Sequence, residues 1–212
     1  GIIKMSKSKC NVVDINTVIE DYGADSARLF VLSDTPADKD FEWTTEGIEG
    51  TWKYINRVWK IGATFVEEND IDKIKSTKIS KVNDLLKENH KAVKSVSSFL
   101  DNLEFNKAIA RLREFSNCIE KFVPQDEEDI AIKYNAIVNL VKMLSPFAPH
   151  LCEELNSILK QSPTLDIAQW PSYNEELTVD NEITIVVQVN GKLRGNIVVE
   201  KDLDKSKVEE LA

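Results

Sequence analysis

Residues 44–66, TTEGIEGTWKYINRVWKIGATFV, set the pattern for most of this chain. Apolar residues recur there at alternating steps of four and three positions, the spacing that places side chains on one face of an α-helix. Thr44 and Thr45 are suitable N-caps for it. The stretch predicts a long helix that packs one face into a core, and the residues on that face are Ile48, Trp52, Ile55, Trp59, Gly62 and Val66.

Further helices follow, separated by polar or proline-containing connections. A polar connection over 67–78 leads to a helix that we expect to bury Val82, Leu86, Val93, Val96 and Leu100. The next is predicted over 106–123 on Ile109, Leu112, Phe115 and Ile119, and another over 128–145 on Ile137, Leu140, Val141 and Leu144. Pro124 and Pro146 end these two helices, and Pro149 suits the first turn of a last one over 149–160. The pattern predicts a helical bundle over residues 44–172.

A shorter connecting segment, residues 1–43, precedes the bundle. Asp14 is placed to cap a helix over 15–22, and Gly23 to end it. A second short helix is expected over 25–33, with Ala27, Phe30 and Val31 turned inward. Pro36 and the polar residues after it then predict a turn into a short strand over 41–43.

The last part of the chain, residues 173–212, changes to a β pattern. Residues 183–189 are mostly β-branched, Asn190-Gly191 is a strong two-residue hairpin signal, and residues 193–199 continue as a second strand. A helix is predicted from about Asp204, and the chain stops within it. Two strands and part of a helix seldom stand alone. We therefore expect either the start of a truncated α+β domain or a hairpin that packs on the bundle.

Composition narrows the function classes. The 212 residues are 42% hydrophobic and 30% charged, which suits a globular protein with a core. No run is long and apolar enough for a membrane span or a signal peptide, so a soluble, cytoplasmic protein is expected. The formal charge of −9 argues against indiscriminate nucleic-acid binding, so any polyanion contact must use local basic patches. The thiols of Cys10, Cys118 and Cys152 are too few and too far apart to predict disulfides or zinc, and buried, reduced thiols are expected.

The first residues carry the sharpest local motif, Lys4-Met5-Ser6-Lys7-Ser8. Two lysines three positions apart, flanked by hydroxyls and with no acid in residues 1–11, suit a polyphosphate, because ammonium groups neutralise its charge and hydroxyls donate to its oxygens. By composition alone, such a segment would normally be a solvated terminus.

The order of residues resolves that ambiguity. The motif, followed by Asn11–Asp14, Tyr22–Asp25 and Arg28–Phe30, resembles the signature loop and following helices of class I aminoacyl-tRNA synthetases. Later segments are similar to the bacterial-type leucine enzymes of that class: Asp40–Trp43, Asn56–Trp59, Phe105–Ile109, Ser145–Leu151, Glu153–Leu155 and Val187–Gly195. The signature loop alone also fits the valine, isoleucine and methionine enzymes, and the Val-Gln-Val-Asn-Gly-Lys hairpin after a bundle favours leucine. The resemblance implies a mainly α fold, with an anticodon-binding-type bundle between the connecting segment and the C-terminal α+β domain.

The resemblance implies a role for each residue of the loop. In the family this loop closes over ATP, which enters with Mg²⁺ as substrate while leucine is activated. Lys7 would stabilise charge developing on the phosphates as pyrophosphate leaves, assisted by Lys4, and the ATP-binding residues would be Lys4, Met5, Ser6, Lys7 and Ser8. The family usually has glycine where this chain has Cys10. If that position needs a positive φ, the side chain costs about 1 kcal/mol.

The same resemblance implies that much of the enzyme lies outside this sequence. The His-x-Gly-His half of the catalytic domain, the leucine pocket and the editing domain precede the loop in the family, so the chain is expected to be inactive alone and to hold no cofactor. His90 and His150 are expected to be structural, and no metal site is predicted.

Basic side chains on the predicted helices are the candidate tRNA contacts. One stripe is Lys53, Arg57 and Lys60, a second is Lys87, Lys91 and Lys94, and Lys192 and Arg194 lie in the hairpin. Ordinary solvated helix faces would show the same spacing. Trp52 and Trp59 are interpreted as packing residues rather than base-stacking ones. The partners implied are tRNA(Leu), ATP and leucine for a monomeric enzyme without a membrane contact. The alternatives are a synthetase for valine or another hydrophobic amino acid, and a free-standing, non-catalytic tRNA-binding bundle.

Overall fold

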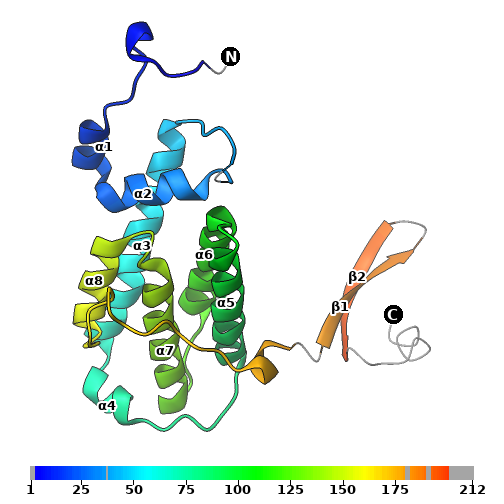
Figure 1. Ribbon diagram of the computed structural model, residues 1–212. Coiled ribbons are helices and arrows are strands. Elements are labelled where there is room, and N and C mark those ends of the chain that lie inside the picture. Colours follow the sequence, from blue (N-terminus) through cyan, green and yellow to red (C-terminus); the bar gives the residue numbers. More distant parts are fainter. Residues whose placement is uncertain (1–2, 37, 180–181, 190–191, 201–212) are drawn as a thin grey trace. The chain divides into compact units, whose positions relative to one another are not determined.

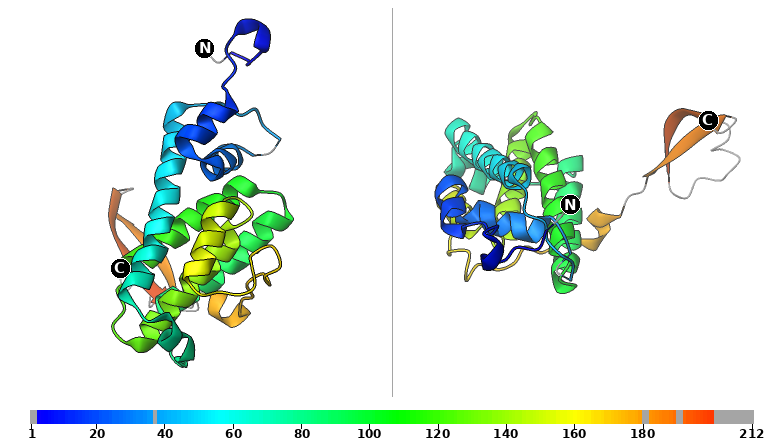
Figure 2. Two further views of the ribbon diagram at one scale, coloured as in Figure 1. Left: turned by 90° about the vertical axis from the view of Figure 1, so that its left-hand side faces the viewer. Right: turned by 90° about the horizontal axis from the view of Figure 1, so that it is seen from above.

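The computed structural model describes the backbone of residues 3–36, 38–179, 182–189 and 192–200, and side chains as far as residue 179. Contacts divide the chain into two units, residues 1–173 and 174–212. The first unit is helical, with short helices at one end, a bundle in the middle and another short helix at the far end (Figures 1 and 2). None of the helices in the described ranges combines the length and apolar composition needed to cross a bilayer.

The connecting segment contains two consecutive short α-helices. Helix α1, Ile15–Tyr22, starts where the Asp14 carboxylate accepts a hydrogen bond from the backbone N–H of Asn16 at 2.9 Å. Gly23, at φ 83°, separates it from α2, Ala24–Ser33. Both helices were predicted. The inward face of α2 was partly wrong, because Val31 is 48% exposed and Leu29 is buried in its place.

The strand predicted over residues 41–43 is absent from the structure, which describes all three residues as irregular. The alternating residues instead serve an aromatic cluster. Phe41 and Trp43 pack edge-on against the buried ring of Phe30, with centroids 5.0 and 5.2 Å away. Alternation toward one face occurs in any extended segment, and a strand also needs a neighbouring strand for its hydrogen bonds. Helix α2 supplies the packing surface here instead.

Helix α3, Thr45–Glu68, runs the length of the bundle (Figure 2). The face that it buries is rotated from the predicted one. The Thr44 hydroxyl accepts the Gly47 N–H at 3.1 Å, as a cap does. Trp52 and Trp59 were expected in the core, yet they are 42% and 37% exposed. The residues buried on α3 are Ile48, Thr51, Tyr54, Val58, Gly62 and Phe65. Periodicity indicates which residues share a face, whereas neighbouring helices decide which face they cover.

One helix was missed between α3 and the next long helix. Helix α4, Ile71–Ser76, interrupts the predicted polar connection and buries Ile71 and Ile74 against the core. Helix α5, Asp84–Asp101, begins after Asn83, whose side chain accepts the Leu86 N–H at 2.9 Å. Val82 precedes this cap and is 53% exposed, so its predicted burial was wrong.

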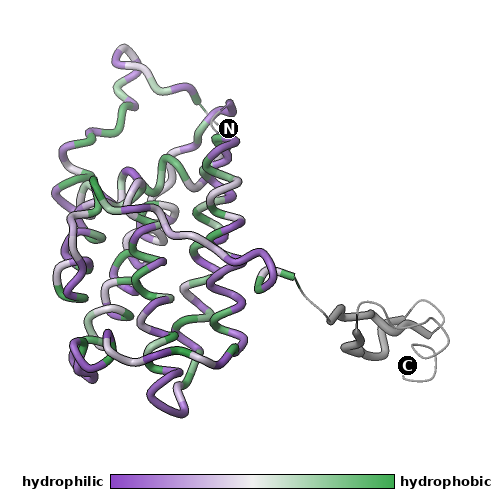
Figure 3. The backbone as a smooth tube through the Cα atoms, turned by 60° about the horizontal axis from the view of Figure 1, so that its bottom comes forward, coloured by the Kyte–Doolittle hydropathy of each residue, from purple (hydrophilic) through white to green (hydrophobic). Residues whose placement is uncertain are grey.

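Three further helices complete the bundle close to their predicted bounds. They are α6, Phe105–Lys121, α7, Glu127–Leu144, and α8, Pro149–Ile158. All eight core residues predicted for α6 and α7 are buried. Hydrophobic and hydrophilic residues alternate along the helices, as expected of helices with one buried face (Figure 3). Helix α3 meets α8 closely at Gly62, where an added Cβ would lie 2.5 Å from Leu155 Cδ2.

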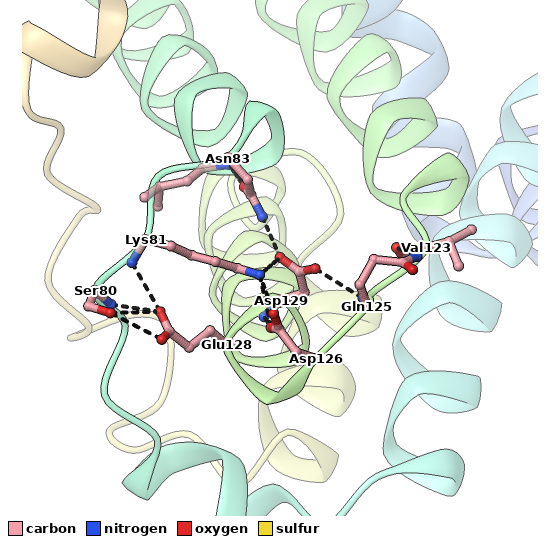
Figure 4. Close-up of polar contacts among 9 residues, drawn as sticks. Ser80, Lys81, Asn83, Val123, Gln125, Asp126, Glu128 and Asp129 are labelled. Carbon is pink, nitrogen blue, oxygen red and sulfur yellow. Dashed lines mark hydrogen bonds and ion pairs between the residues drawn. The ribbon is translucent and has the colours of Figure 1, made fainter.

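A polar cluster around Lys81 ties the connection before α5 to the start of α7 (Figure 4). The Lys81 ammonium lies 2.7 Å from Asp126 Oδ2 and 2.6 Å from Asp129 Oδ1. Glu128 accepts the backbone N–H groups of Ser80 and Lys81 at 2.8 and 3.0 Å. The Lys81 ammonium is the main cause that holds the pKa of both Asp126 and Asp129 below the usual range. The cluster adds polar contacts that hold residues 80–83 against the start of α7.

The second unit is described by itself. It contains a 3₁₀ turn, η2, Glu175–Thr178, and two antiparallel strands, β1, Glu182–Val189, and β2, Lys192–Glu200. Glu182 pairs with Glu200 and Val189 with Lys192, with an irregularity between Val187 and Gln188. The predicted Asn190-Gly191 turn and the helix predicted from Asp204 lie outside the described residues. The proposed domain limits of 1–43, 44–172 and 173–212 remain predictions.

Candidate functional site

The Lys4–Ser8 loop folds back on itself through one side chain. Asn11 Oδ1 accepts the Ser6 N–H at 2.8 Å, and Asn11 Nδ2 donates to the Lys4 carbonyl at 3.3 Å. Ser6 and Ser8 hydroxyls lie 3.2 Å apart, and Lys7–Lys9 form the 3₁₀ turn η1. The loop therefore has a defined shape of its own, set by Asn11, for which no structural role was predicted.

Cys10 ends this turn in the left-handed region, at φ 50° and ψ 32°. Its N–H donates to the Lys7 carbonyl at 3.2 Å. Position 10 therefore has the positive φ that was considered from the sequence, a conformation that glycine adopts without penalty. The Cys10 thiol is exposed, as is that of Cys118, so the expected burial holds only for Cys152. Burial raises the pKa of the Cys152 thiol well above its usual value.

The basic groups of the loop remain available to an anion. Lys4, Lys7 and Lys9 are exposed, and among the described residues none of them pairs with a carboxylate. Beside Lys4 and Met5 lies a hollow of about 790 Å³, closed on its other side by residues 40–43. Asp40 and Glu42 line that side, so the lysine end is the part suited to phosphate.

Helix α2 links this loop segment to the bundle. Buried Asp25 accepts hydrogen bonds from the Leu151 N–H at 2.7 Å and the His150 N–H at 3.4 Å. His150 Nδ1 lies 2.8 Å from the same carboxylate. Arg28 donates to the carbonyls of Phe147 and Pro146 at 3.4 and 3.0 Å. Asp25 thus supplies the N-terminus of α8 with acceptors that its own N-cap, Ala148, lacks. The prediction of a structural His150 agrees with this contact.

The first basic stripe is partly neutralised within the protein. Arg57 donates to Glu120 Oε2 from Nε at 2.8 Å, and a second donation comes from Nη2. Lys53 lies 3.9 Å from Glu49. Lys60 is exposed beside a hollow of about 190 Å³ that also contains Lys133, whose pKa is lowered by burial. Of the three stripe residues, Lys60 is the one without an ion pair among the described residues.

The second stripe and the strand residues differ in what the structure shows of them. Lys87 is exposed on α5, while Lys91 and Lys94 are half-buried and have partners of their own. Lys192 and Arg194 lie on β2, and their side chains are outside the described set. No group of three or more His, Cys, Asp or Glu side chains able to hold a metal occurs among the described residues.

Two features of the site were not predicted from the sequence. The Asp25 contact joins residues more than a hundred positions apart, and no local pattern announces such a pair. The exposure of Trp52 and Trp59 was also missed, although each is followed directly by a lysine. The repeated Trp-Lys pair is the sequence feature that could have indicated this exposure.

Comparisons with known proteins agree along nearly the whole chain. The family described as the anticodon-binding domain of tRNA ligase matches residues 83–209, and class I tRNA synthetases for I, L, M and V match residues 3–44. The leucine–tRNA ligase of Zymomonas mobilis is 41% identical over 99% of the chain, and that of Geobacter sp. strain M21 is 40% identical over 97%. These alignments cover 23% and 25% of the two ligases, so the chain spans about a quarter of their length.

Solved structures show a similar fold. The LeuRS of Agrobacterium radiobacter K84, in a ternary complex with tRNA and LeuAMS, superposes with a TM-score of 0.76 at 25% identity. That match covers 98% of this chain and 27% of the other. The methionyl-tRNA synthetase of Mycobacterium tuberculosis gives a TM-score of 0.59 at 17% identity over 75% of this chain and 36% of its own, a likeness of fold alone.

Proposed function

Because the chain belongs to the family of anticodon-binding domains of tRNA ligases, we propose that it is part of a leucine–tRNA ligase. Such an enzyme activates leucine with ATP to leucyl-adenylate and transfers the leucyl group to tRNA(Leu). The observation that carries the proposal is one continuous alignment, 41% identical to a leucine–tRNA ligase, that spans 99% of the chain, from loop to hairpin.

The alternatives fit these findings less well. A valine enzyme, or one for another hydrophobic amino acid, would share the loop, but the relatives near 40% identity are named leucine–tRNA ligases. A free-standing bundle would need no signature loop, whereas residues 3–44 match class I synthetases.

Within this proposal the Lys4–Ser8 loop binds ATP. The leucine carboxylate attacks the α-phosphate in line, and charge builds on the departing pyrophosphate. Lys7 stabilises that charge with assistance from Lys4, while Met5, Ser6 and Ser8 shape the loop and bind phosphate oxygens. The support is geometric: the lysines are exposed and free of carboxylates, in a turn already held by Asn11. ATP enters with Mg²⁺ as substrate, and the remaining active-site groups come from other parts of the enzyme.

The bundle contacts the tRNA backbone in the same proposal. Lys53, Arg57 and Lys60 form the first contact stripe, and Lys87, Lys91, Lys94, Lys192 and Arg194 are further candidates. Arg57 binds a phosphate only by releasing Glu120, so Lys60 contributes more to tRNA binding than Arg57 does. The enzyme acts as a monomer in the cytoplasm.

The decisive experiment substitutes Lys7→Ala in the full-length enzyme and measures leucine-dependent pyrophosphate exchange. Loss of one charge-stabilising group should reduce the rate about 100-fold, with tRNA affinity nearly unchanged. Lys39→Ala, at an exposed lysine beside Asp38, is the control and should exchange normally. Unchanged exchange in Lys7→Ala would remove Lys7 from the mechanism. Leucine activation by the 212-residue chain alone would contradict the proposal that the remaining active-site groups come from other parts of the enzyme.

A further inference from the structure

Two tryptophans on α3 differ from the other tryptophans of this protein. Trp52 is 42% exposed and Trp59 is 37% exposed. Among the described residues, neither indole donates a hydrogen bond or packs on another ring. By contrast, Trp43 lies edge-on to Phe30 at 5.2 Å, and Trp170 donates to the Ser97 hydroxyl at 2.9 Å. Trp52 and Trp59 therefore lack the polar and aromatic partners that give the other two a structural role.

The two indoles share one side of the helix. Seven residues make nearly two turns, so Trp52 and Trp59 lie about 20° apart around α3 and about 10.5 Å apart along it. Asn56 lies between them on the same side and is exposed, with its amide bound to the Trp52 carbonyl at 2.8 Å. At this separation the two rings cannot enclose a single flat group, so each ring must pack on a separate group.

A lysine follows each tryptophan directly, so that Trp52-Lys53 is repeated as Trp59-Lys60. Both lysines occupy the same flank of the exposed face, seven residues apart. The Lys53 side chain is 71% exposed and lies 3.9 Å from Glu49, a separation that contributes little in water. The face thus offers an aromatic ring and a cation twice, in the same order.

The charge around Trp52 and Trp59 favours an RNA rather than a protein as the partner of this helix face. Residues 50–66 contain no Asp or Glu and three cations, of which Arg57 is paired with Glu120, so Lys53 and Lys60 are the cations beside the indoles, within a chain of formal charge −9. A local cationic stretch on an acidic protein is complementary to a polyanion. An apolar docking patch for protein would be continuous, whereas polar Asn56, Lys53 and Lys60 surround these indoles.

We propose that Trp52 and Trp59 are base-stacking residues, each packing on an unpaired base of a bound RNA while Lys53 and Lys60 contact the adjacent phosphates. Aromatic stacking and a basic flank are the elements by which proteins bind single-stranded nucleic acid. This inference rests on the proposed function, because it takes tRNA(Leu) as the RNA. It adds base contacts to a surface otherwise expected to touch only the backbone.

The test uses the full-length ligase and measures tRNA(Leu) affinity together with leucine-dependent pyrophosphate exchange, which needs no tRNA. Trp52→Ala and Trp59→Ala should each weaken tRNA binding about tenfold, with exchange unchanged. Trp59→Phe should retain most of the affinity, because a smaller ring still stacks. Trp170→Ala, at an indole with the same 37% exposure on a different segment, is the matched control and should bind normally.

Heparin, a polyanion without bases, separates stacking from charge. It should bind Trp59→Ala as well as the unaltered ligase and Lys60→Gln more weakly. Unchanged tRNA affinity in both tryptophan variants overturns the inference and leaves the proposed function intact. Loss of exchange together with a lower melting temperature in those variants would also overturn the base-stacking inference, because it would show that the indoles pack on protein. Absence of exchange in the unaltered enzyme contradicts the proposed function itself.

Discussion

The carboxylate of Asp25 accepts a hydrogen bond from the backbone N–H of Leu151 at 2.7 Å, across 126 residues of sequence. The bond joins the short helix behind the Lys4–Ser8 loop to the first turn of α8. That turn has N–H groups with no acceptor inside the helix, and a negative charge is favoured there. Asp25 therefore acts as an N-cap supplied from another part of the chain.

Asp25→Ala should lower the free energy of unfolding by about 2 kcal/mol, because it leaves N–H groups at the α8 terminus without their acceptor. Asp25→Asn keeps one acceptor oxygen and should cost less. Urea unfolding followed by circular dichroism measures both. Asp21→Ala, at an exposed carboxylate on α1, is the control and should change stability by less than about 0.5 kcal/mol. Equal stabilities of Asp25→Ala and the control would show that water replaces this cap.

Two glycines three residues apart on α3 should respond oppositely to alanine. At Gly47 an added Cβ would lie 2.7 Å from Phe30 Cζ and from the Thr44 hydroxyl, whereas at Gly50 nothing lies within 4 Å. Gly47→Ala should destabilise by about 1–3 kcal/mol through overpacking. Gly50→Ala should stabilise by about 0.5–1 kcal/mol, because alanine is the better helix former. Thermal unfolding of the pair measures both, and a shared direction would contradict the packing of Phe30 on α3.

The hydroxyl of Tyr54 is buried and has no hydrogen-bond partner among the described residues. Burial raises its pKa to about 12, opposed only in part by the nearby Ser116 hydroxyl and the Arg113 guanidinium, which lies 4.6 Å from the ring centroid. Tyr54→Phe should therefore stabilise the protein by about 1 kcal/mol, since it removes a polar group that lost its water.

Tyr134→Phe is the counterpart to that substitution. The Tyr134 hydroxyl donates to the Leu159 carbonyl at 2.8 Å and accepts from Gln161 at 2.6 Å. Its removal should destabilise by about 1 kcal/mol or more. Denaturant unfolding of both variants checks the pair. A loss of stability in Tyr54→Phe would indicate that the Ser116 hydroxyl satisfies Tyr54 after all.

The Lys81 cluster should make stability fall in acid. The folded pKa values of Asp126 and Asp129 are lowered mainly by Lys81, and that of Glu128 mainly by the Ser80 N–H. A carboxylate with a lowered folded pKa stabilises the protein fully above its unfolded pKa of about 4, and this stability is lost as pH falls through the folded value.

Lys81→Met should reduce the dependence of unfolding free energy on pH below about pH 5. Without the ammonium, the pKa values of Asp126 and Asp129 return toward those of the unfolded chain, so folding takes up or releases fewer protons. Urea titrations between about pH 2.5 and 7 measure the slope. Lys39→Met, at an exposed lysine beside Asp38, should keep the slope of the unaltered chain. A slope unaltered in Lys81→Met would assign the acid sensitivity to other carboxylates.

Cys10→Gly should raise the free energy of unfolding by up to about 1 kcal/mol, as measured by urea unfolding. The left-handed backbone at φ 50° costs a residue with a Cβ about 1 kcal/mol, and glycine adopts it freely. Cys10→Ala removes the thiol and keeps the Cβ, so it should match the unaltered enzyme. Equal stabilisation in both variants would point to the thiol rather than the backbone.

The helices with the strongest local signals were predicted well. Asp14, Thr44 and Pro149 begin helices where the sequence placed them, because caps depend on neighbours within about four residues. Short α4 was missed, because six residues give too little periodicity to distinguish a helix from a polar connection. The strand over residues 41–43 was wrong, because its alternating aromatics pack on Phe30 instead of on a neighbouring strand.

The candidate site, like the fold, was predicted only in part. The Lys4–Ser8 motif is contiguous, so the sequence alone supports the prediction that it binds phosphate. The glycine expected at position 10 raised the question of a positive φ there, and the structure shows one at Cys10. The pairing of Arg57 with Glu120 was not foreseeable, because the two residues lie 63 positions apart on different helices.

By itself, the sequence determined the helical bundle, most helix ends and the family, and it predicted a phosphate-binding loop. These properties follow from caps, periodicity and motifs, all of which act over short stretches. The tertiary structure alone decided how α3 is turned, which cations are neutralised and how Asp25 joins the loop segment to α8. Apolar side chains near the boundary of a helix face can be buried or exposed, and only the placement of neighbouring helices selects between them. For Trp52 and Trp59, that selection left the indoles exposed at the surface beside two lysines.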